Sequence, residues 1–462
     1  MLKDNLTDTI AAISTPVGEG GIGIVRLSGK DALKIADKIF VSKDGKKPST
    51  FVTYTVHYGW IVARQETGII DEVLLTVMRS PRSFTKEDIV EINCHGGIIA
   101  TRAVLERVLE GACRLAEPGE FTKRAFLNGR IDLAQAEAVL DVIRAKTDGA
   151  LKLGLEQLKG GLSKEINKIR SYLLDALAAL EADIDFPEEG SFSLETPKIY
   201  GKLKSAQNDC KKILENARRG QVFREGIHVV ICGRPNVGKS SLLNALLKTE
   251  RSIVTPVAGT TRDTVEEIID IKGIPVRIVD TAGILEPRDL IEKKAVEHSK
   301  KHIAAADLVI LMFDASKQLA KDDLNLIKKL SRKNCIAVIN KIDLNNKIKS
   351  EKITKIFRHT VALSAKKNKN IDLLEEAIAD LIYRGEVFRA EYSMVSNLRH
   401  ITALRHAQKL IAEALNSLDN KLPPEFISQD IKEAMSFIDD ILGKTFTEDL
   451  LDKIFSDFCI GK

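Results

Sequence analysis

The feature that most constrains this chain is the segment 228–384, in which short apolar runs alternate with amphipathic helical patterns. The apolar runs are 228–232, 276–279, 308–313, 335–339 and 361–363. Strands that alternate with helices in this way pack as a parallel sheet with helices on both faces. The sequence therefore predicts a doubly wound α/β domain in this part of the chain.

The residues between the first strand and the first helix of this domain, 233–240, read GRPNVGKS. A glycine-rich loop of this spacing wraps phosphates with its backbone N–H groups at the positively polarised start of a helix. In such loops the lysine, here Lys239, reaches the β- and γ-phosphates, and the hydroxyl of Ser240 binds Mg²⁺. The loop predicts a nucleoside triphosphate site.

Three later strands of the same domain also end in polar segments, which are DTAG at 280–283, NKID at 340–343 and SAK at 364–366. The carboxyl ends of parallel strands meet at one edge of a sheet, so these segments and the phosphate loop predict one shared site. Asp280 is expected near Mg²⁺ and the Gly283 amide near the γ-phosphate. The Asp343 carboxylate can accept two hydrogen bonds from guanine, which adenine does not offer, so the predicted ligand is GTP.

The segment 254–263, VTPVAGTTRD, lies where a switch loop carries a threonine for Mg²⁺, and Thr261 is the predicted ligand.

No glutamine follows Gly283 as far as residue 297, so another group must orient the attacking water. The acids that could do so are Glu286, Glu292 and Glu297, and the residues alone leave the choice open.

The flanking regions have different patterns. Residues 1–125 combine β-branched runs at 21–27, 73–78 and 89–94 with helical patterns at 31–40 and 99–110. Helical spacing dominates from residue 131, interrupted at Gly160–Gly161 and ended at 185–187, and it recurs at 198–219, 397–418, 425–441 and 447–456. The last helix is expected to be capped by Thr445 with Glu448. These patterns predict a helical domain interrupted by the α/β domain.

The composition is that of an ordinary globular protein, with 44% hydrophobic and 29% charged residues and a net charge of +5. The charge permits nucleic-acid contact but does not argue for it. No apolar run is long enough to span a bilayer and the N-terminus lacks a signal-peptide core, so we expect a cytoplasmic protein without membrane attachment. The six cysteines show no zinc spacing; they are Cys94, Cys113, Cys210, Cys232, Cys335 and Cys459.

Several blocks outside the nucleotide motifs are distinctive, namely GGIGIVRLSG at 20–29, PGEFTKRAFLN at 118–128, DLAQAE at 132–137 and the terminal FCIGK at 458–462. With these blocks the chain resembles the bacterial MnmE (TrmE) family of tRNA-modifying GTPases along essentially its whole length. The resemblance implies a multidomain α+β protein. Its parts would be an N-terminal α+β folate-binding domain (1–128), a helical domain in two parts (129–224 and 386–462) and an inserted Ras-like GTPase domain (225–385).

The resemblance implies a K⁺-stimulated GTPase whose GTPase domains dimerise across the nucleotide. In that family K⁺ takes the place of an arginine finger. The matching K⁺ ligands are Asn236, Thr255, Thr260 and the backbone of Val257. The same resemblance favours Glu292 as the water-directing acid, with Arg262 as a rival stabiliser of the transition state.

The expected contacts with GTP and its Mg²⁺, which Ser240 and Thr261 would bind, come from five segments of the α/β domain. They are Asn236, Val237, Gly238, Lys239, Ser240, Ser241, Thr255, Pro256, Val257, Ala258, Gly259, Thr260, Thr261, Asp280, Thr281, Ala282, Gly283, Asn340, Lys341, Asp343, Ser364, Ala365 and Lys366.

The family's N-terminal domain binds 5-formyl- or 5,10-methylene-tetrahydrofolate and forms a constitutive homodimer. The matching folate residues are Arg26, Glu91, Arg130 and Lys462; position 130 is also Lys in the family, and Arg keeps the charge with a different geometry. Cys459 is either a buried anchor or a reactive thiol beside the folate, and an exposed thiol would need a depressed pKa to react.

The implied function is a subunit of the enzyme that installs a C5 (carboxymethyl)aminomethyl group on the wobble uridine of certain tRNAs. It would act with the FAD-dependent MnmG (GidA) partner in a heterotetramer. The folate would supply the one-carbon unit and GTP hydrolysis would drive conformational change. The alternative is a regulatory or ribosome-assembly GTPase without modification chemistry, which would have no use for the folate residues or Cys459. A membrane-associated transport GTPase is disfavoured because no spanning segment is predicted.

Overall fold

The computed structural model describes residues 8–64, 68–185, 192–248, 266–280, 303–383 and 394–462. The chain forms two compact units, one of residues 1–140 with 439–462 and the other of residues 141–438. Both ends of the chain therefore belong to the same unit. The predicted four-part division into 1–128, 129–224, 225–385 and 386–462 stays a prediction.

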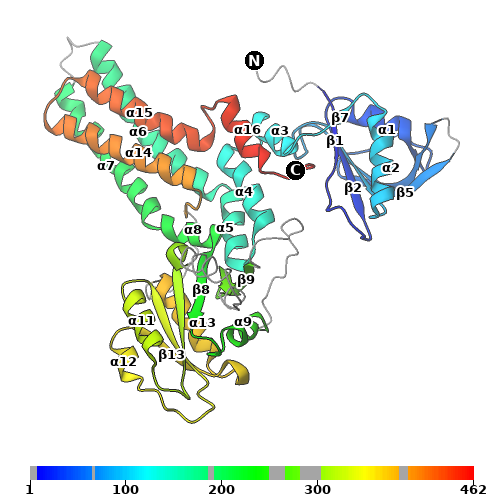
Figure 1. Cartoon of the computed structure of the whole chain (residues 1–462). Helices are drawn as coiled ribbons and strands as arrows, with labels where there is room; N and C mark the ends of the chain where they lie inside the picture. Colours follow the sequence, from blue (N-terminus) through cyan, green and yellow to red (C-terminus); the bar gives the residue numbers. More distant parts are fainter. Residues whose placement is uncertain (1–7, 65–67, 186–191, 249–265, 281–302, 384–393) are drawn as a thin grey trace, which may run out of the picture. The chain divides into compact units, whose positions relative to one another are not determined.

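The first unit is built on a seven-stranded sheet with the order β3-β4-β5-β6-β2-β1-β7 (Figure 1). Its strands are β1 (Ile10–Ile13), β2 (Gly23–Ser28), β3 (Phe40–Ser42), β4 (Thr55–Val62), β5 (Ile69–Met78), β6 (Ile89–Cys94) and β7 (Arg114–Leu115). All neighbouring strands pair antiparallel except β1 and β7, which run parallel. The predicted strands at 21–27, 73–78 and 89–94 are confirmed as β2, β5 and β6.

Two helices, α1 (Ala32–Ile39) and α2 (Ile98–Leu109), cover one face of this sheet, and both were predicted. Alternate residues of the strands point into the core that they form, because side chains in a strand alternate between the two faces. Val25, Leu27, Ile92 and Leu75 are wholly buried there. A short 3-10 turn, η1 (Pro48–Thr50), precedes β4.

The C-terminal end of the chain completes this unit. Helix α16 (Glu448–Ser456) packs on α3 (Glu120–Leu127), with Phe126, Leu451 and Phe455 in a common apolar cluster. The final residues continue along the sheet, where the Phe121 amide donates to the Lys462 carbonyl (3.1 Å) and Ser14 Oγ donates to the Gly461 carbonyl (3.1 Å). The last two carbonyls are thus part of the fold.

The predicted cap of α16 is wrong. The N-cap residue is Thr447, whose hydroxyl accepts a hydrogen bond from the Leu450 amide, whereas Thr445 donates to Asp440. Both threonines precede acidic residues in the first turn, so the spacing of a capping box does not by itself choose between them.

Besides the helices that pack on its sheet, the second unit contains a set of further helices. They are α5 (Asp148–Leu158), α6 (Gly161–Asp185), α7 (Phe192–Glu215), α8 (Ala217–Glu225), α14 (Leu398–Asp419) and α15 (Pro424–Leu442). Helix α4 (Leu133–Arg144) begins in the residue range of the first unit, and α15 ends in it. Helix α7 packs along α6 and α14. Gly160 has a positive φ of 87°, which ends α5 before α6 begins, as the glycine pair predicted.

The predicted α/β domain is a six-stranded sheet with the order β13-β12-β11-β8-β10-β9. Its strands are β8 (Ile227–Gly233), β9 (Glu266–Ile271), β10 (Ile274–Asp280), β11 (Leu308–Asp314), β12 (Cys335–Asn340) and β13 (His359–Leu363). The five predicted strands are confirmed. Strand β9 was not predicted, and it pairs antiparallel to β10 at the sheet edge. Its sequence, EEIIDI, has too short an apolar run to be recognised alone.

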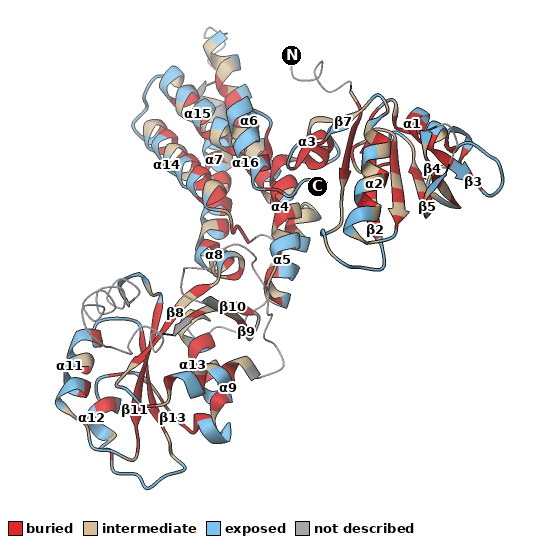
Figure 2. Cartoon of the chain, turned by 45° about the vertical axis from the view of Figure 1, so that its right-hand side comes forward, coloured by how far each residue is buried: buried red, intermediate tan, exposed pale blue. Residues whose placement is uncertain are grey.

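Helices cover both faces of this sheet, so the domain is doubly wound. Helices α9 (Lys239–Lys248) and α13 (Ile371–Tyr383) pack on one face, and α11 (Lys321–Leu330) and α12 (Glu351–Thr354) on the other. The 3-10 turn η5 (Ala365–Lys367) follows β13. Strand β11 is buried along its whole length (Figure 2). In the described part of the chain, no helix combines the length and apolar character needed to cross a membrane.

One buried ionic cluster joins the elements of the first unit. The Arg124 side chain is fully buried in α3 and donates hydrogen bonds to Glu120, Glu87 and Asp8. Burial opposes the ionisation of Glu120 and Asp8. Hydrogen bonds from Arg114 and Arg124 outweigh it, and the pKa of each carboxyl lies below its usual value.

We predict that Arg124→Met destabilises the first unit by about 3–5 kcal/mol near neutral pH, because the buried Glu120 and the less buried Glu87 and Asp8 lose the cation that they share. The difference from the parent should shrink as the pH falls through the lowered pKa values of the carboxyls, since protonated groups no longer need the cation. Urea unfolding can be followed at Trp60, the single tryptophan, which lies in β4. Arg102→Met, which breaks an exposed pair with Glu106, is the control and should change stability by less than about 0.5 kcal/mol. Equal effects of the two variants would contradict the role given to the cluster.

Candidate nucleotide site

The phosphate loop connects the end of β8 to the start of α9, as predicted. Gly238 has a positive φ of 102°, and a Cβ there would collide with the side-chain amide of Asn340. Asn236 also has a positive φ, 64°. These backbone conformations turn the chain sharply between the strand and the helix. Backbone N–H groups at the amino end of α9 are therefore available for an anion.

Lys239 is the first residue of α9 and is 6% exposed. Its Nζ donates to the carbonyls of Gly233 (3.2 Å) and Arg234 (3.1 Å), which lie in the loop itself. The ammonium group is thus held over the loop that it would share with phosphates. Ser240 and Ser241 follow in the same first turn and are exposed.

Asn340, at the end of β12, ties the phosphate loop to the segment after β13. Its side-chain amide is 2% exposed and donates to the Val237 carbonyl (2.8 Å). Its side-chain oxygen accepts hydrogen bonds from the amides of Lys341 (2.8 Å) and Ala365 (3.0 Å). Three of the predicted motifs therefore meet at one side chain.

Lys341 extends from this point along the phosphate loop. Its Nζ donates to the Asn236 carbonyl (2.7 Å) and to Asp314 Oδ2 (2.7 Å). Sequence reasoning missed Asp314, the last residue of β11. Burial opposes its ionisation, yet hydrogen bonds from Lys341 and Ser316 lower the pKa of its carboxyl. The available signal was a carboxylate directly after the apolar run 308–313, at the same sheet edge as the motifs.

Asp343 and Ser364 form the predicted base-recognition end of the site. Asp343 is exposed, and its Oδ1 accepts a hydrogen bond from Ser364 Oγ (2.6 Å). That hydrogen bond, with the charges of Lys366 and Lys367, lowers the pKa of the Asp343 carboxyl. The group is therefore ionised near neutral pH and retains free lone pairs, as acceptance from two guanine donors requires.

Asp280 is the last residue of β10, and its backbone pairs with Ile231 of β8, so it lies at the same sheet edge. The remaining predicted residues lie outside the described residues. They are Thr255, Pro256, Val257, Ala258, Gly259, Thr260, Thr261, Arg262, Thr281, Ala282, Gly283, Glu286, Glu292 and Glu297.

A second set of predicted residues comes together in the first unit. Arg26 Nε donates to Glu91 Oε1 (2.8 Å) across β2 and β6, and Arg26 Nη1 donates to the Gly461 carbonyl (3.4 Å). The same guanidinium lies 5.6 Å from the centre of the Phe121 ring. Lys462 is held beside it through the hydrogen bond of its carbonyl with the Phe121 amide.

Arg130, the other predicted folate residue, contacts Phe84. Its guanidinium lies 4.8 Å from the centre of the Phe84 ring and donates to the Phe84 carbonyl (3.0 Å). Phe84 packs against the apolar cluster that contains Phe121. Cys459 is exposed, and its carbonyl accepts a hydrogen bond from the Gly119 amide (3.4 Å). The backbone at Cys459 is thus anchored, but the residue is exposed, so its interpretation as a buried anchor is wrong and its role as a reactive thiol stays a prediction.

A doubly wound sheet with a phosphate loop and an NKID segment at the same sheet edge is the arrangement of a GTPase. The model of the MnmE helical domain matches residues 133–459, and that of the GTP-binding protein TrmE N-terminus matches residues 9–130. The chain belongs to the MnmE family of tRNA modification GTPases.

Relatives of nearly the same length support this assignment. The chain is 46% identical over 458 residues to the tRNA modification GTPase MnmE of Geobacillus thermodenitrificans, covering 98% of this chain and 99% of that one. It is 47% identical to the MnmE of Clostridioides difficile, covering 99% and 100%, and 44% identical to that of Bacillus subtilis, covering 98% and 100%.

We predict that Asp343→Asn weakens GTP binding by about 10–100-fold, because guanine loses a charged acceptor for two of its donors. The same variant should bind xanthosine triphosphate, since the new amide can donate to the extra carbonyl of xanthine. Affinities for both nucleotides can be measured by calorimetry. Asp380→Asn, an exposed carboxylate on α13, is the matched control and should leave both affinities unchanged. An unaltered preference in Asp343→Asn would place base recognition elsewhere.

Proposed function

We propose that this chain is the K⁺-stimulated GTPase subunit of the enzyme that adds a C5 (carboxymethyl)aminomethyl group to wobble uridines of tRNA. It would act in the cytoplasm as a homodimer, in a heterotetramer with the FAD-dependent MnmG (GidA) partner. GTP hydrolysis would drive a conformational change of the assembly, and 5-formyl- or 5,10-methylene-tetrahydrofolate would supply the one-carbon unit.

The observation that carries this proposal is the second charged site, formed by the Arg26–Glu91 pair beside the chain terminus. Its two side chains are 18% and 20% exposed, so they are ordered by their neighbours yet accessible to a ligand. The Glu91 carboxylate suits the amino-pyrimidine edge of a pterin, and the cations of Arg130 and Lys462 suit the glutamate tail of a folate. The Phe121 ring is fully buried and lies 5.6 Å from the Arg26 guanidinium, so it positions this cation and does not itself face a ligand. A GTPase that acts only as a switch has no need of such a site.

The residues at the nucleotide fit the cations that the proposal requires. Ser240, in the first turn of α9, would bind Mg²⁺ with Thr261. Asn236 would bind K⁺ with Thr255, Thr260 and the Val257 carbonyl. The Asn236 carbonyl is already engaged by Lys341, which leaves its side chain for the ion.

The sheet of the first unit supports the proposed homodimer. On the face opposite α1 and α2, strands β4 and β5 carry Val56, Tyr58 and Leu74, which are 59%, 38% and 46% exposed. Tyr58 lies directly opposite Leu74 in the register, so these side chains form one continuous apolar strip. A strip of this kind is typical of a surface that another protein covers.

The alternative function, a regulatory or ribosome-assembly GTPase, shares the nucleotide site but not the folate site. Wobble uridines in tRNA from cells lacking this protein distinguish the two. The proposal expects the C5 (carboxymethyl)aminomethyl group to be lost and to return with the parent gene but not with Arg26→Ala or Glu91→Ala. Unchanged wobble uridines would leave the alternative function.

We predict that Glu292→Ala slows GTP hydrolysis by about 10²–10⁴-fold with little change in GTP affinity, because the carboxylate would act on the attacking water. Single-turnover hydrolysis should be measured in K⁺ and in Na⁺. The parent should be faster in K⁺, while the variant should be slow in both salts. Equal parent rates in the two salts would remove the K⁺ site and restore Arg262 as the stabiliser. A variant rate within a few-fold of the parent would remove Glu292.

A further inference from the structure

The β9–β10 hairpin links two segments that should surround the nucleotide. Strand β9 starts at Glu266, directly after segment 249–265, and β10 ends at Asp280, directly before segment 281–302. These segments carry the predicted Thr261 and Glu292 and lie outside the described residues. The strands pair continuously from Ile271 and Ile274 at the turn to Glu266 and Val279 at the open end.

The turn of this hairpin is docked on the amino end of α5. Thr147 Oγ1 donates to the Gly273 carbonyl (2.8 Å) and accepts a hydrogen bond from the Ala150 amide (3.1 Å). The hydroxyl thus caps α5 and binds the turn at the same time. Thr147 is 6% exposed, so the hydrogen bond to the turn is protected from water.

Gly149 makes the close approach of the turn possible. A Cβ at this position would lie 2.6 Å from the Gly273 carbonyl oxygen and 2.8 Å from the Phe223 ring of α8. Real Cβ atoms do not approach other atoms so closely, so any other residue would displace the turn or the ring. Gly226, between α8 and β8, meets the Pro275 carbonyl in a similar way.

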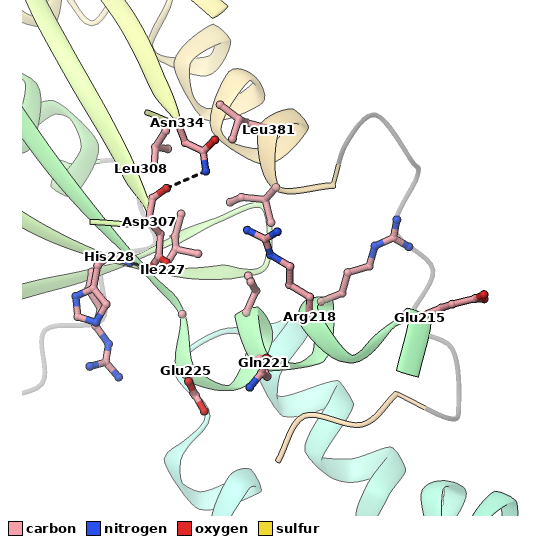
Figure 3. A pocket seen from close by; sticks show the side chains of 15 residues that line it. Glu215, Arg218, Gln221, Glu225, Ile227, His228, Asp307, Leu308, Asn334 and Leu381 are labelled. Carbon is pink, nitrogen blue, oxygen red and sulfur yellow. Dashed lines mark hydrogen bonds between the residues drawn. The ribbon is translucent and has the colours of Figure 1, made fainter. Parts of the chain in front are cut away.

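The surroundings of this contact are loosely packed. A cavity of about 540 Å³ lies between α5 and the hairpin, lined among others by Leu153, Ile268 and Pro275. A second cavity, of about 780 Å³, lies between α8 and the amino ends of the strands (Figure 3). Arg277 of β10 borders both cavities. The docked turn is therefore a narrow contact with space beside it.

We propose that Thr147 and Gly149 are positioning residues of the GTPase site, which act through the β9–β10 hairpin and couple the nucleotide to α5. A paired two-stranded ladder moves largely as a unit, so a displacement at its open end shifts its turn. The Gly273 carbonyl of the turn contacts the Thr147 hydroxyl and lies close to the Gly149 backbone, so a shift of the turn changes its contact with α5. This inference rests on the proposed role of GTP hydrolysis in driving a conformational change.

The kinetic test uses four full-length variants. Gly149→Ala should lower kcat of GTP hydrolysis about tenfold or more with KM changed less than about threefold, because a small displacement of the water-orienting segment is costly. Thr147→Val should have the same effect and Thr147→Ser should keep the parent rate, since serine retains both hydrogen bonds. Gly201→Ala in α7 is the control, because a Cβ there meets no atom within 4 Å. Parent-like kcat in both Gly149→Ala and Thr147→Val would overturn the positioning role.

Hydrogen exchange measured with GDP and with a non-hydrolysable GTP analogue tests the coupling directly. In the parent, the nucleotide should change amide protection both in 266–280 and in 145–155. In Gly149→Ala the change in 266–280 should persist and that in 145–155 should disappear. A parent that responds in 266–280 alone, or a Gly149→Ala variant that responds in both, would overturn the coupling. A parent that responds in neither segment would refute the proposed conformational change, and the coupling with it.

Discussion

The nucleotide site depends on one buried amide, the side chain of Asn340. Its hydrogen bonds join the phosphate loop at Val237 to the segment after β13 at Ala365, two segments far apart in the sequence. Each hydrogen-bonding group of this buried amide that lost its partner would cost about 1–3 kcal/mol of stability. The hydrogen bonds of Asn340 therefore hold the two segments together. The same side chain explains Gly238, since any Cβ there would collide with it. The phosphate loop and the segment predicted to contact the base are therefore one structural unit.

A comparable constraint closes the first unit at the other end of the chain. The backbone oxygens of Gly461 and Lys462 accept hydrogen bonds from Ser14, directly after β1, and from Phe121 of α3, so the terminus is fixed to residues more than 300 positions before it. The Arg26–Glu91 pair lies against this backbone through the Gly461 carbonyl. The charged site of the first unit thus combines residues from both parts of the sequence that form this unit, whereas the described residues of the nucleotide site all belong to the second unit.

Strong local signals account for the elements that were predicted. The five predicted strands of the α/β domain are rich in apolar and β-branched residues, and the amphipathic helices repeat over several turns. The element that was missed, β9, has a short apolar run between acidic residues, and it is stabilised by its register with β10. The cap of α16 was misplaced because Thr445 and Thr447 both stand before acidic residues. The extended backbone of Thr447 and its hydrogen bond from the Leu450 amide identify it as the N-cap.

The sequence by itself determined five of the strands of the α/β domain, the place of the phosphate loop and the family, and it predicted guanine recognition at Asp343. Each depends on residues that are close in the chain, where local spacing fixes the chemistry. The tertiary structure alone decided that Asp314 holds Lys341 and that the terminus meets Arg26. It also decided that the β9–β10 turn rests on Thr147 and Gly149. These contacts join residues far apart in sequence, and a hydrogen bond or a close approach between them exists only once the packing of whole elements has brought them together.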